Sequence, residues 1–308
     1  MTPPDPLLAP RRAPVLARTR AELDAALAGL GGRAATGKPY GRAVVMTMGA
    51  LHAGHLSLVR RARELAEQVV VTIFVNPLQF GAGEDLDRYP RDLAGDVTLL
   101  ASVGADVVFA PTQDVLLPDG DPVVRVTAGR LGTVLEGVTR PGHLDGVLTI
   151  VLKLMHLARP DVAIFGQKDA QQVMAVQRMV RDLDLPVVVL AAPTVRDADG
   201  LALSSRNAYL SPLERTNALA LNRALRAAEL AAGAPGADAD AVRGAALAVL
   251  ARADLELDYV ALVDPGTAEQ VPAGHRGPAV LAVAATVGAT RLIDNVPLRL
   301  GERAEVLA

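Results

Sequence analysis

Short apolar runs alternate with segments of helical periodicity along the first 192 residues of this 308-residue chain. The run at 69–75 (VVVTIFV) is continuous, which is typical of a strand that is buried on both faces. Such alternation indicates a parallel sheet with right-handed crossovers. The predicted fold class is therefore α/β, with a Rossmann-like, doubly wound parallel sheet. The other strands are expected at 42–48, 105–110, 162–166 and 187–192, and the helices at 54–67, 97–103, 147–157 and 171–183.

The pattern changes after Pro193, where a long polar loop begins. Ala-rich helical segments and then strand-like runs follow this loop, which favours a second, smaller α+β domain. We therefore expect two domains, at 1–194 and 195–308, and a flexible Pro-rich arm over the first 14 residues. The helices of the second domain are expected at 212–232 and 239–253, and its strands at 258–263, 279–287 and 291–296.

The composition excludes several classes of function. The chain has no cysteine, so disulfides, thiolate nucleophiles and cysteine-based zinc sites are absent. A formal net charge of −3 with mixed signs argues against a nucleic-acid partner. No apolar run approaches the roughly 20 residues of a membrane span, and the N-terminal segment lacks the apolar core of a signal peptide. We expect a soluble cytoplasmic protein that binds small molecules.

One glycine-rich segment has the spacing of a phosphate loop. Gly32, Gly37 and Lys38 match the Walker A pattern within GLGGRAATGKPYG. A true phosphate loop follows a strand and continues through Ser or Thr into a helix. Here no strand is predicted before the segment, and Pro39 takes the place of the hydroxyl residue. The segment is therefore predicted not to bind phosphate.

The segment MGALHAGH (48–55) lies between a predicted buried strand and a predicted helix. Ligands of open α/β sheets bind where strands end and helices begin, and a helix N-terminus offers N–H groups to phosphate. His52 and His55 can both project there, and imidazolium groups could neutralise charge on a transferring phosphoryl group. Two surface histidines in a turn, or half of a zinc site, are the alternatives, although the spacing indicates no third zinc ligand.

Three further segments carry polar groups suited to a small anion. Gln79 follows a buried strand and offers a donor and an acceptor, although it could equally cap a loop. Lys168 lies at a predicted helix start, where the dipole disfavours a cation unless an anion binds there. Asp169 can cap that helix. The sequence SSR at 204–206 combines hydroxyls with a guanidinium, which suits phosphate oxygens, although serine-rich turns are common.

Five ordered segments covering most of residues 42–210 resemble the pantothenate synthetase family. The H-x-G-H motif of His52 and His55 is shared with the wider nucleotidyltransferase superfamily and is only moderately specific. Five segments in the family's order are highly specific. They are MTMGALHAGH, FVNPLQFGAGEDLDRYPR, HLDGVLTIVLKL, FGQKDAQQ and PTVRDADGLALSSRNAYL.

The resemblance implies an ATP-dependent ligase that joins (R)-pantoate to β-alanine and forms pantothenate on the way to coenzyme A. In this family the pantoate carboxylate attacks the α-phosphate, giving pantoyl adenylate and pyrophosphate, and the amine of β-alanine then displaces AMP. Positioning and charge stabilisation suffice for this chemistry, so no covalent nucleophile is needed. The family also implies Mg²⁺, a homodimer, and a C-terminal domain that acts as a lid.

The resemblance also assigns residues. We expect His55 to carry the main catalytic role, with His52 and Lys168 assisting at the phosphates. Gln79 and Gln172 are implied to hold pantoate, and Gln79 also to contact β-alanine. The residues implied to bind ATP are Met48, Gly49, Ala50, Leu51, His52, Ala53, Gly54, His55, Gly166, Gln167, Lys168, Asp169, Val195, Leu203, Ser204, Ser205 and Arg206.

Weaker candidates surround these residues, and no metal ligand is assigned. Asp96 matches a family carboxylate that could lie near magnesium, but a solvated helix acid is at least an equal alternative. Asn76 and Tyr89 are weaker neighbours of Gln79, and His143 lies in a matching segment without a defined role. Structural roles are expected for His156 and His275, and Lys153, inside an apolar helix, is expected to extend its ammonium to the surface.

The chain departs from the family by its 14-residue N-terminal arm, which has no clear counterpart, and by apolar exchanges, which affect pocket shape rather than a polar role. These exchanges are at Met46, Leu144, Ala170 and Leu203.

Two other functions stay open. A transferase of the same superfamily that keeps the nucleotide in its product should lack the Gln79–Gln172 pair and the KDxQQ run. A non-catalytic nucleotide-binding relative should have lost His55, Lys168 or the Ser205–Arg206 pair, and all of these are present.

Overall fold

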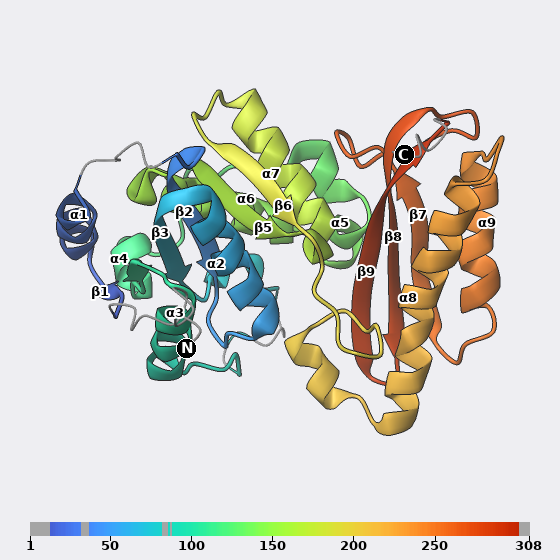
Figure 1. Ribbon diagram of the computed structural model, residues 1–308, viewed down its shortest axis with the longest axis horizontal. Helices are drawn as coiled ribbons and strands as arrows, with labels where there is room; N and C mark the ends of the chain where they lie inside the picture. Colours follow the sequence, from blue (N-terminus) through green and yellow to red (C-terminus); the bar gives the residue numbers. More distant parts are fainter. Residues whose placement is uncertain (1–12, 32–36, 82–85, 87, 302–308) are drawn as a thin grey trace, which may run out of the picture. The chain divides into compact units, whose positions relative to one another are not determined.

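The computed structural model describes residues 13–31, 37–81, 86 and 88–301. Most of the expected N-terminal arm and Gly32 of the rejected phosphate loop lie outside these residues. The chain forms two compact units (Figure 1). The first comprises Met1–Gly132, Arg140–Gly166 and Ala175–Ala192, and the second comprises Thr133–Thr139, Gln167–Met174 and Pro193–Ala308. The expected domain boundary at residues 194 and 195 stays a prediction.

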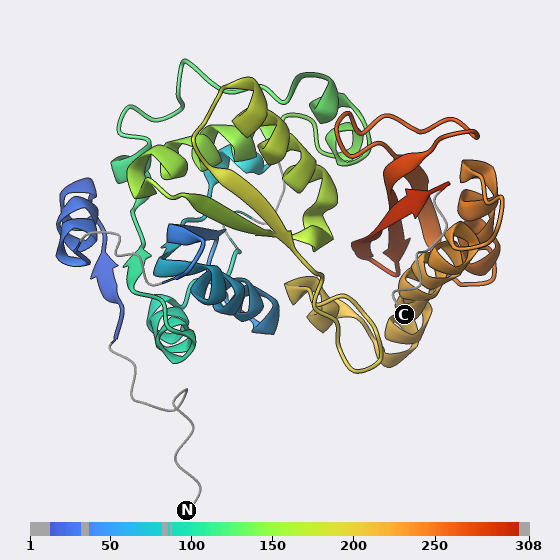
Figure 2. The ribbon, with the colours of Figure 1, turned by 45° about the horizontal axis from the view of Figure 1, so that its top comes forward.

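A parallel sheet in the order β1-β4-β3-β2-β5-β6 forms the centre of the first unit. Helices α2 and α3 cover one face, and α6 and α7 cover the other (Figure 2). This arrangement confirms the predicted doubly wound α/β class. The strands are β1 (Val15–Ala17), β2 (Tyr40–Thr47), β3 (Ala66–Ile73), β4 (Val107–Phe109), β5 (Val162–Gly166) and β6 (Val188–Ala192). The helices are α1 (Arg20–Gly29), α2 (Ala53–Leu65), α3 (Leu93–Val103), α4 (Gln113–Leu116), α6 (His143–Ala158) and α7 (Ala170–Asp182).

Local signals set the ends of these elements. The Thr19 hydroxyl accepts a hydrogen bond from the backbone N–H of Glu22, and the Glu22 carboxylate accepts one from the Thr19 N–H, so α1 starts with a capping box. The Asp92 side chain accepts from the Gly95 amide at 2.9 Å and starts α3. Gly104 ends α3 with φ +81°, a left-handed conformation that glycine adopts without a steric penalty.

The structure differs from the sequence predictions mainly at element ends. Strand β1 was not predicted, because three residues at a sheet edge carry no readable periodicity. Helix α6 begins four residues before its predicted start at residue 147, and β3 begins three residues before residue 69. Lys38 of the rejected phosphate loop donates to the backbone carbonyls of Arg63 and Ala66, at the end of α2.

The second unit contains an antiparallel sheet in the order β7-β8-β9. Apolar side chains of the sheet and of two helices, among them Leu221, Leu225, Leu262 and Leu281, form one buried core. The predicted α+β arrangement is confirmed. The strands are β7 (Glu256–Val263), β8 (Gly277–Val287) and β9 (Thr290–Leu300), and the helices are α5 (Glu136–Thr139), α8 (Pro212–Ala232) and α9 (Ala239–Leu250).

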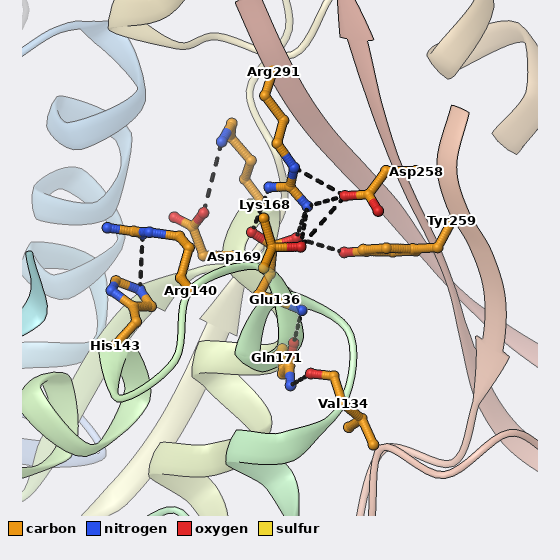
Figure 3. Close-up of polar contacts among 11 residues, drawn as sticks. Val134, Glu136, Arg140, His143, Lys168, Asp169, Gln171, Asp258, Tyr259 and Arg291 are labelled. Atoms are coloured by element: carbon orange, nitrogen blue, oxygen red, sulfur yellow. Dashed lines mark hydrogen bonds and ion pairs between the residues drawn. The ribbon is translucent and has the colours of Figure 1, made fainter. Parts of the chain in front are cut away.

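Arg291 on β9 joins a short segment of this unit to the sheet (Figure 3). Its guanidinium donates to both carboxylate oxygens of Glu136, at 2.7 and 2.8 Å, and also to Asp258. The Tyr259 hydroxyl donates to the same Glu136 carboxylate at 2.8 Å. The hydrogen bond to Glu136 raises the pKa of Arg291, and burial followed by the Glu136 charge raises the pKa of Tyr259. Tyr259 therefore stays a neutral donor, and α5 is fixed to the sheet by charged groups.

Among the described residues, no helix combines the length and apolarity needed to cross a membrane.

We predict that Arg291→Ala lowers the free energy of unfolding of the second unit by about 2 kcal/mol, because Glu136 loses its bidentate partner in a partly buried site. Urea denaturation followed by circular dichroism measures the change. Arg226→Ala is the matched control, because its pair with Glu229 is exposed and should change stability by less than about 0.5 kcal/mol. Equal changes in the free energy of unfolding would show that the Arg291–Glu136 pair stabilises the unit no more than an exposed ion pair does.

Candidate active site

The order of the parallel strands creates a switch point at β2. From β2 the chain continues to β3 on one side, and it later returns to β5, which pairs with β2 on the other side. Ligands of doubly wound sheets bind outside the carboxyl ends of the strands at such a point. The segment Met48–His55 leaves β2 there, and Gly166 is the last residue of β5.

Asp96 on α3 holds the turn that follows β2. The turn passes through left-handed conformations at Gly49 (φ +86°) and at Ala50 (φ +51°), which a residue with a side chain rarely adopts. The Asp96 carboxylate accepts hydrogen bonds from the backbone N–H groups of Ala50 at 3.1 Å and Leu51 at 2.8 Å. A Cβ atom at Gly49 would lie 3.0 Å from the same carboxylate, so glycine permits this close approach. A single buried carboxylate on the neighbouring helix α3 therefore stabilises the conformation of this turn.

His52 and His55 form a reciprocal cap at the start of α2. His52 is the N-cap, and its Nδ1 accepts from the backbone N–H of Gly54 at 3.1 Å. The Nδ1 atom of His55 accepts in turn from the backbone N–H of His52 at 3.3 Å. The ring centroids lie 4.1 Å apart. The H-x-G-H spacing thus places both rings at one helix end, as predicted.

The cap fixes which nitrogen of each ring carries the proton. A ring nitrogen that accepts an N–H cannot itself be protonated, so Nδ1 of His52 and of His55 is bare and Nε2 carries the hydrogen. Protonation to imidazolium would break the cap. The cap therefore leaves Nε2 of each ring as its N–H donor, a point that the sequence left open.

Gln79 ends a short 3₁₀ helix, η2 (Pro77–Gln79), which begins at the buried Asn76. The Asn76 Nδ2 atom donates to Gln79 Oε1 at 3.1 Å and also to the Gly146 carbonyl. Gln79 Nε2 lies 3.1 Å from the sulfur of Met48. The Gln79 side chain and the turn after β2, predicted separately, therefore meet in the first unit. Tyr89 packs edge-on against Phe80, with ring centroids 6.3 Å apart.

Helix α6 supports the backbone of Gln79. His143 Nδ1 lies 2.9 Å from the Gln79 carbonyl oxygen, and Arg140 donates to the same oxygen at 3.2 Å. Arg140 Nη1 lies 3.2 Å from His143 Nε2, and because arginine only donates, His143 accepts there and carries its proton on Nδ1. A Cβ atom at Gly146 would overlap the Leu78 carbonyl. His143 thus has a defined contact, and Arg140 and Gly146, which lie in the same matching segment, were not singled out from the sequence.

The remaining predicted site residues lie in the second unit. Lys168 belongs to the 3₁₀ helix η4 (Gln167–Asp169), and its Nζ lies 3.6 Å from Asp169 Oδ1. Gln172 is half-buried in the first turns of α7. The expected polar loop is a narrow hairpin, in which the Leu203 amide donates to the Val195 carbonyl at 2.9 Å.

Ser204 caps a further 3₁₀ helix, η5 (Ser205–Tyr209), by accepting from the Arg206 amide at 3.3 Å. Ser205 and Arg206 are exposed. Part of the expected phosphate-binding group thus has a structural role, since the Ser204 hydroxyl forms the cap.

Asp96 is not the solvated helix acid that the sequence left as an alternative, because it is 4% exposed. Each of its oxygens accepts a backbone N–H group, so it does not present the open carboxylate that Mg²⁺ prefers. Within the described part of the chain, no cluster of three or more His, Asp or Glu side chains could hold a metal. These residues do not build a magnesium site of protein ligands alone, and we assign no step to the ion.

The switch-point helix end and the parallel sheet define a nucleotidyltransferase-like α/β protein. Comparison with known proteins then gives the family. The family model described as pantoate-beta-alanine ligase matches residues 16–297. The chain therefore belongs to the pantoate-beta-alanine ligase family, and the resemblance of its motifs is confirmed.

Individual relatives agree with this family. The pantothenate synthetase of Thermobifida fusca is 57% identical over 297 residues, which cover 94% of this chain and 97% of that protein. The crystal structure of pantothenate synthetase from Thermus thermophilus has 46% identity and a TM-score of 0.82, covering 92% of this chain and 98% of that one. A pantoate-beta-alanine ligase from Francisella tularensis, complexed with beta-gamma ATP and beta-alanine, has 31% identity and a TM-score of 0.70, covering 92% and 97%.

We predict that Asp96→Ala lowers the free energy of unfolding by about 2–4 kcal/mol, because two buried N–H groups lose their acceptor. Amide hydrogen exchange should also accelerate at Ala50 and Leu51, which nuclear magnetic resonance can follow. Asp92→Ala is the control, because this exposed neighbour caps α3 through one bond and should cost about 1 kcal/mol. Unchanged exchange at Ala50 and Leu51 in Asp96→Ala would contradict the assigned role.

Proposed function

We propose that this protein joins pantoate to β-alanine with the consumption of ATP, through a pantoyl-adenylate intermediate. The observation that carries the proposal is the reciprocal cap of His52 and His55 at the switch point of the sheet. Family membership and the relative crystallised with beta-gamma ATP and beta-alanine support the substrates. The product is pantothenate, and AMP and pyrophosphate are released.

The first step requires stabilisation of charge. A carboxylate oxygen of pantoate attacks the α-phosphorus of ATP, a P–O bond forms, and the bond to the pyrophosphate oxygen breaks. The Nε2–H groups of His55 and His52 donate to phosphate oxygens as charge moves onto them, together with the amides at the N-terminus of α2. Neutral rings serve this purpose, because a donor aimed at a developing negative charge needs only its N–H group.

The second step requires that the acyl group of the adenylate is held in position for attack by the amine. The amine of β-alanine attacks the carbonyl carbon of the adenylate, the C–N bond forms, AMP leaves, and the nitrogen loses a proton. Gln79 is the proposed contact to pantoate and β-alanine, and its side chain is oriented by Asn76. A transferase that keeps the nucleotide in its product would have no use for a second acceptor site of this kind.

Residues of the second unit are also proposed to bind ATP and pantoate. Lys168 and the segment Ser204–Arg206 supply donors to the phosphates of ATP, the backbone at Gly166–Asp169 and at Val195 and Leu203 contacts the nucleotide, and Gln172 contacts pantoate. Mg²⁺ would arrive with ATP and neutralise its phosphates. A homodimer and a cytoplasmic location are proposed from the family alone.

The adenylate mechanism predicts that pantoate and ATP, without β-alanine, support the exchange of labelled pyrophosphate into ATP. Without β-alanine the second step cannot occur, so reversal of the first step carries the label from pyrophosphate into ATP. Thin-layer chromatography of the nucleotides measures the label. Omitting pantoate is the control and should abolish exchange. Failure of metal-replete protein to exchange label, while the same preparation forms pantothenate, would rule out the adenylate.

We predict that His55→Ala abolishes adenylate formation, and that His55→Asn does so with the helix cap intact. The amide of asparagine places an acceptor where Nδ1 lies and provides no group at the position of Nε2. The measured quantities are the rate of pyrophosphate exchange and the melting temperature. His156→Asn, at an exposed position, is the matched control and should keep full activity. Near-normal turnover by His55→Asn would show that the His55 imidazole does not take part in the reaction.

A further inference from the structure

A buried amide on strand β9 contacts the turn that contains Lys168. Asn295 is 4% exposed, and its Nδ2 donates to the backbone carbonyls of Gln167 and of Lys168, each at 2.8 Å. Its Oδ1 accepts from the side chain of Gln167 at 3.1 Å. Both donors of one side chain are thus used on two successive carbonyls of η4, which fixes the orientation of that turn.

The start of α7, which directly follows this turn, is held through a second residue of β9. Gln171 accepts from the Glu136 amide at 2.9 Å and donates to the Val134 carbonyl at 2.7 Å (Figure 3). Glu136 is in turn paired with Arg291, four residues before Asn295 on β9. Residues four apart on a strand share one face. One face of β9 therefore holds the turn through Asn295 and the start of α7 through Arg291 and Glu136.

The hairpin that leads to Ser204 is attached to the opposite face of β9. Asp294, which is 3% exposed, forms a two-pronged ion pair with Arg196, at 2.6 and 3.0 Å. Arg196 also donates to the Gly200 carbonyl and pairs with Ala202 across the hairpin. Neighbouring residues of one strand thus bind the two segments of this unit that are proposed to bind the phosphates of ATP.

We propose that Asn295 is a positioning residue for Lys168, and that β9 orients the phosphate-binding groups of the second unit. The proposal rests on the proposed role of Lys168 in the first step of the reaction. Several rotatable bonds separate the Lys168 ammonium from its Cα atom. The position of the backbone therefore determines which ligand atoms the ammonium can contact. Asn295 fixes that backbone directly and touches it through carbonyl groups only, so it acts on the phosphates through Lys168.

Asparagine is suited to this position by its two donors. Aspartate has the same shape, but its carboxylate would face two carbonyl oxygens at hydrogen-bond distance and repel both. Asn295→Asp therefore releases the turn without a large change in volume. Asn295→Ser removes the same donors without adding a charge, and it serves as the second variant where the aspartate protein does not fold.

The test is a double-mutant cycle on pyrophosphate exchange with Asn295→Asp, Lys168→Ala and the double variant. Displacement of a catalytic group by about 1 Å can cost 10²-fold in rate, so we expect Asn295→Asp to slow exchange by about 10- to 100-fold. In the Lys168→Ala background the same substitution should have little further effect, because the two residues act as one unit. Transfer of chemically supplied pantoyl adenylate to β-alanine should keep its normal rate in Asn295→Asp.

Leu292→Val is the matched control on the same strand, because it weakens the core of the unit without touching the turn. Its melting temperature should fall while its exchange rate stays that of the wild type. Exchange that Asn295→Asp slows by the same factor with and without Lys168 would overturn the inference, as would slowing of both half-reactions together. A wild-type protein without exchange would instead overturn the proposed function, and this inference with it.

Discussion

The hydrogen bonds that the amides of Ala50 and Leu51 donate to Asp96 are the interaction on which the turn between β2 and α2 depends. They stabilise a turn with two successive left-handed residues, and that turn delivers His52 to the N-cap of α2. The acid thus acts on the geometry of the site from a neighbouring helix, without contact to either imidazole.

The histidines of the first unit differ in which ring nitrogen carries the proton. His52 and His55 accept backbone N–H groups at Nδ1 and are left with a proton on Nε2, whereas His143 carries its proton on Nδ1 and supports the carbonyl of Gln79. The hydrogen-bond partner decides the tautomer in each case. Nδ1 of His52 and of His55 is thus occupied by the helix cap, and Nε2 is the nitrogen left to donate to a ligand.

The sequence predicted the fold class well, because buried parallel strands and amphipathic helices have distinct periods. It also singled out His52, His55 and Gln79, and the structure brings the two imidazoles to one helix end and Gln79 next to Met48 in the preceding turn. It did not predict the role of Asp96, since an acid in the first turn of a helix has the same pattern whether it faces solvent or a neighbouring turn. Asn295 was missed for a related reason: its partners are backbone carbonyls distant in sequence, and a carbonyl has no sequence signature.

The bond from Asn295 to the Lys168 carbonyl closes a loop of 127 residues. Contacts of such separation form late, because the entropy of closing the loop must be overcome before the contact stabilises anything. Strands β2, β3 and β5 pair with one another and not with β9, so the parallel sheet does not need the Asn295 contact in order to form. If Lys168 has its proposed role, a chain with a formed sheet and without this contact would be structured and inactive.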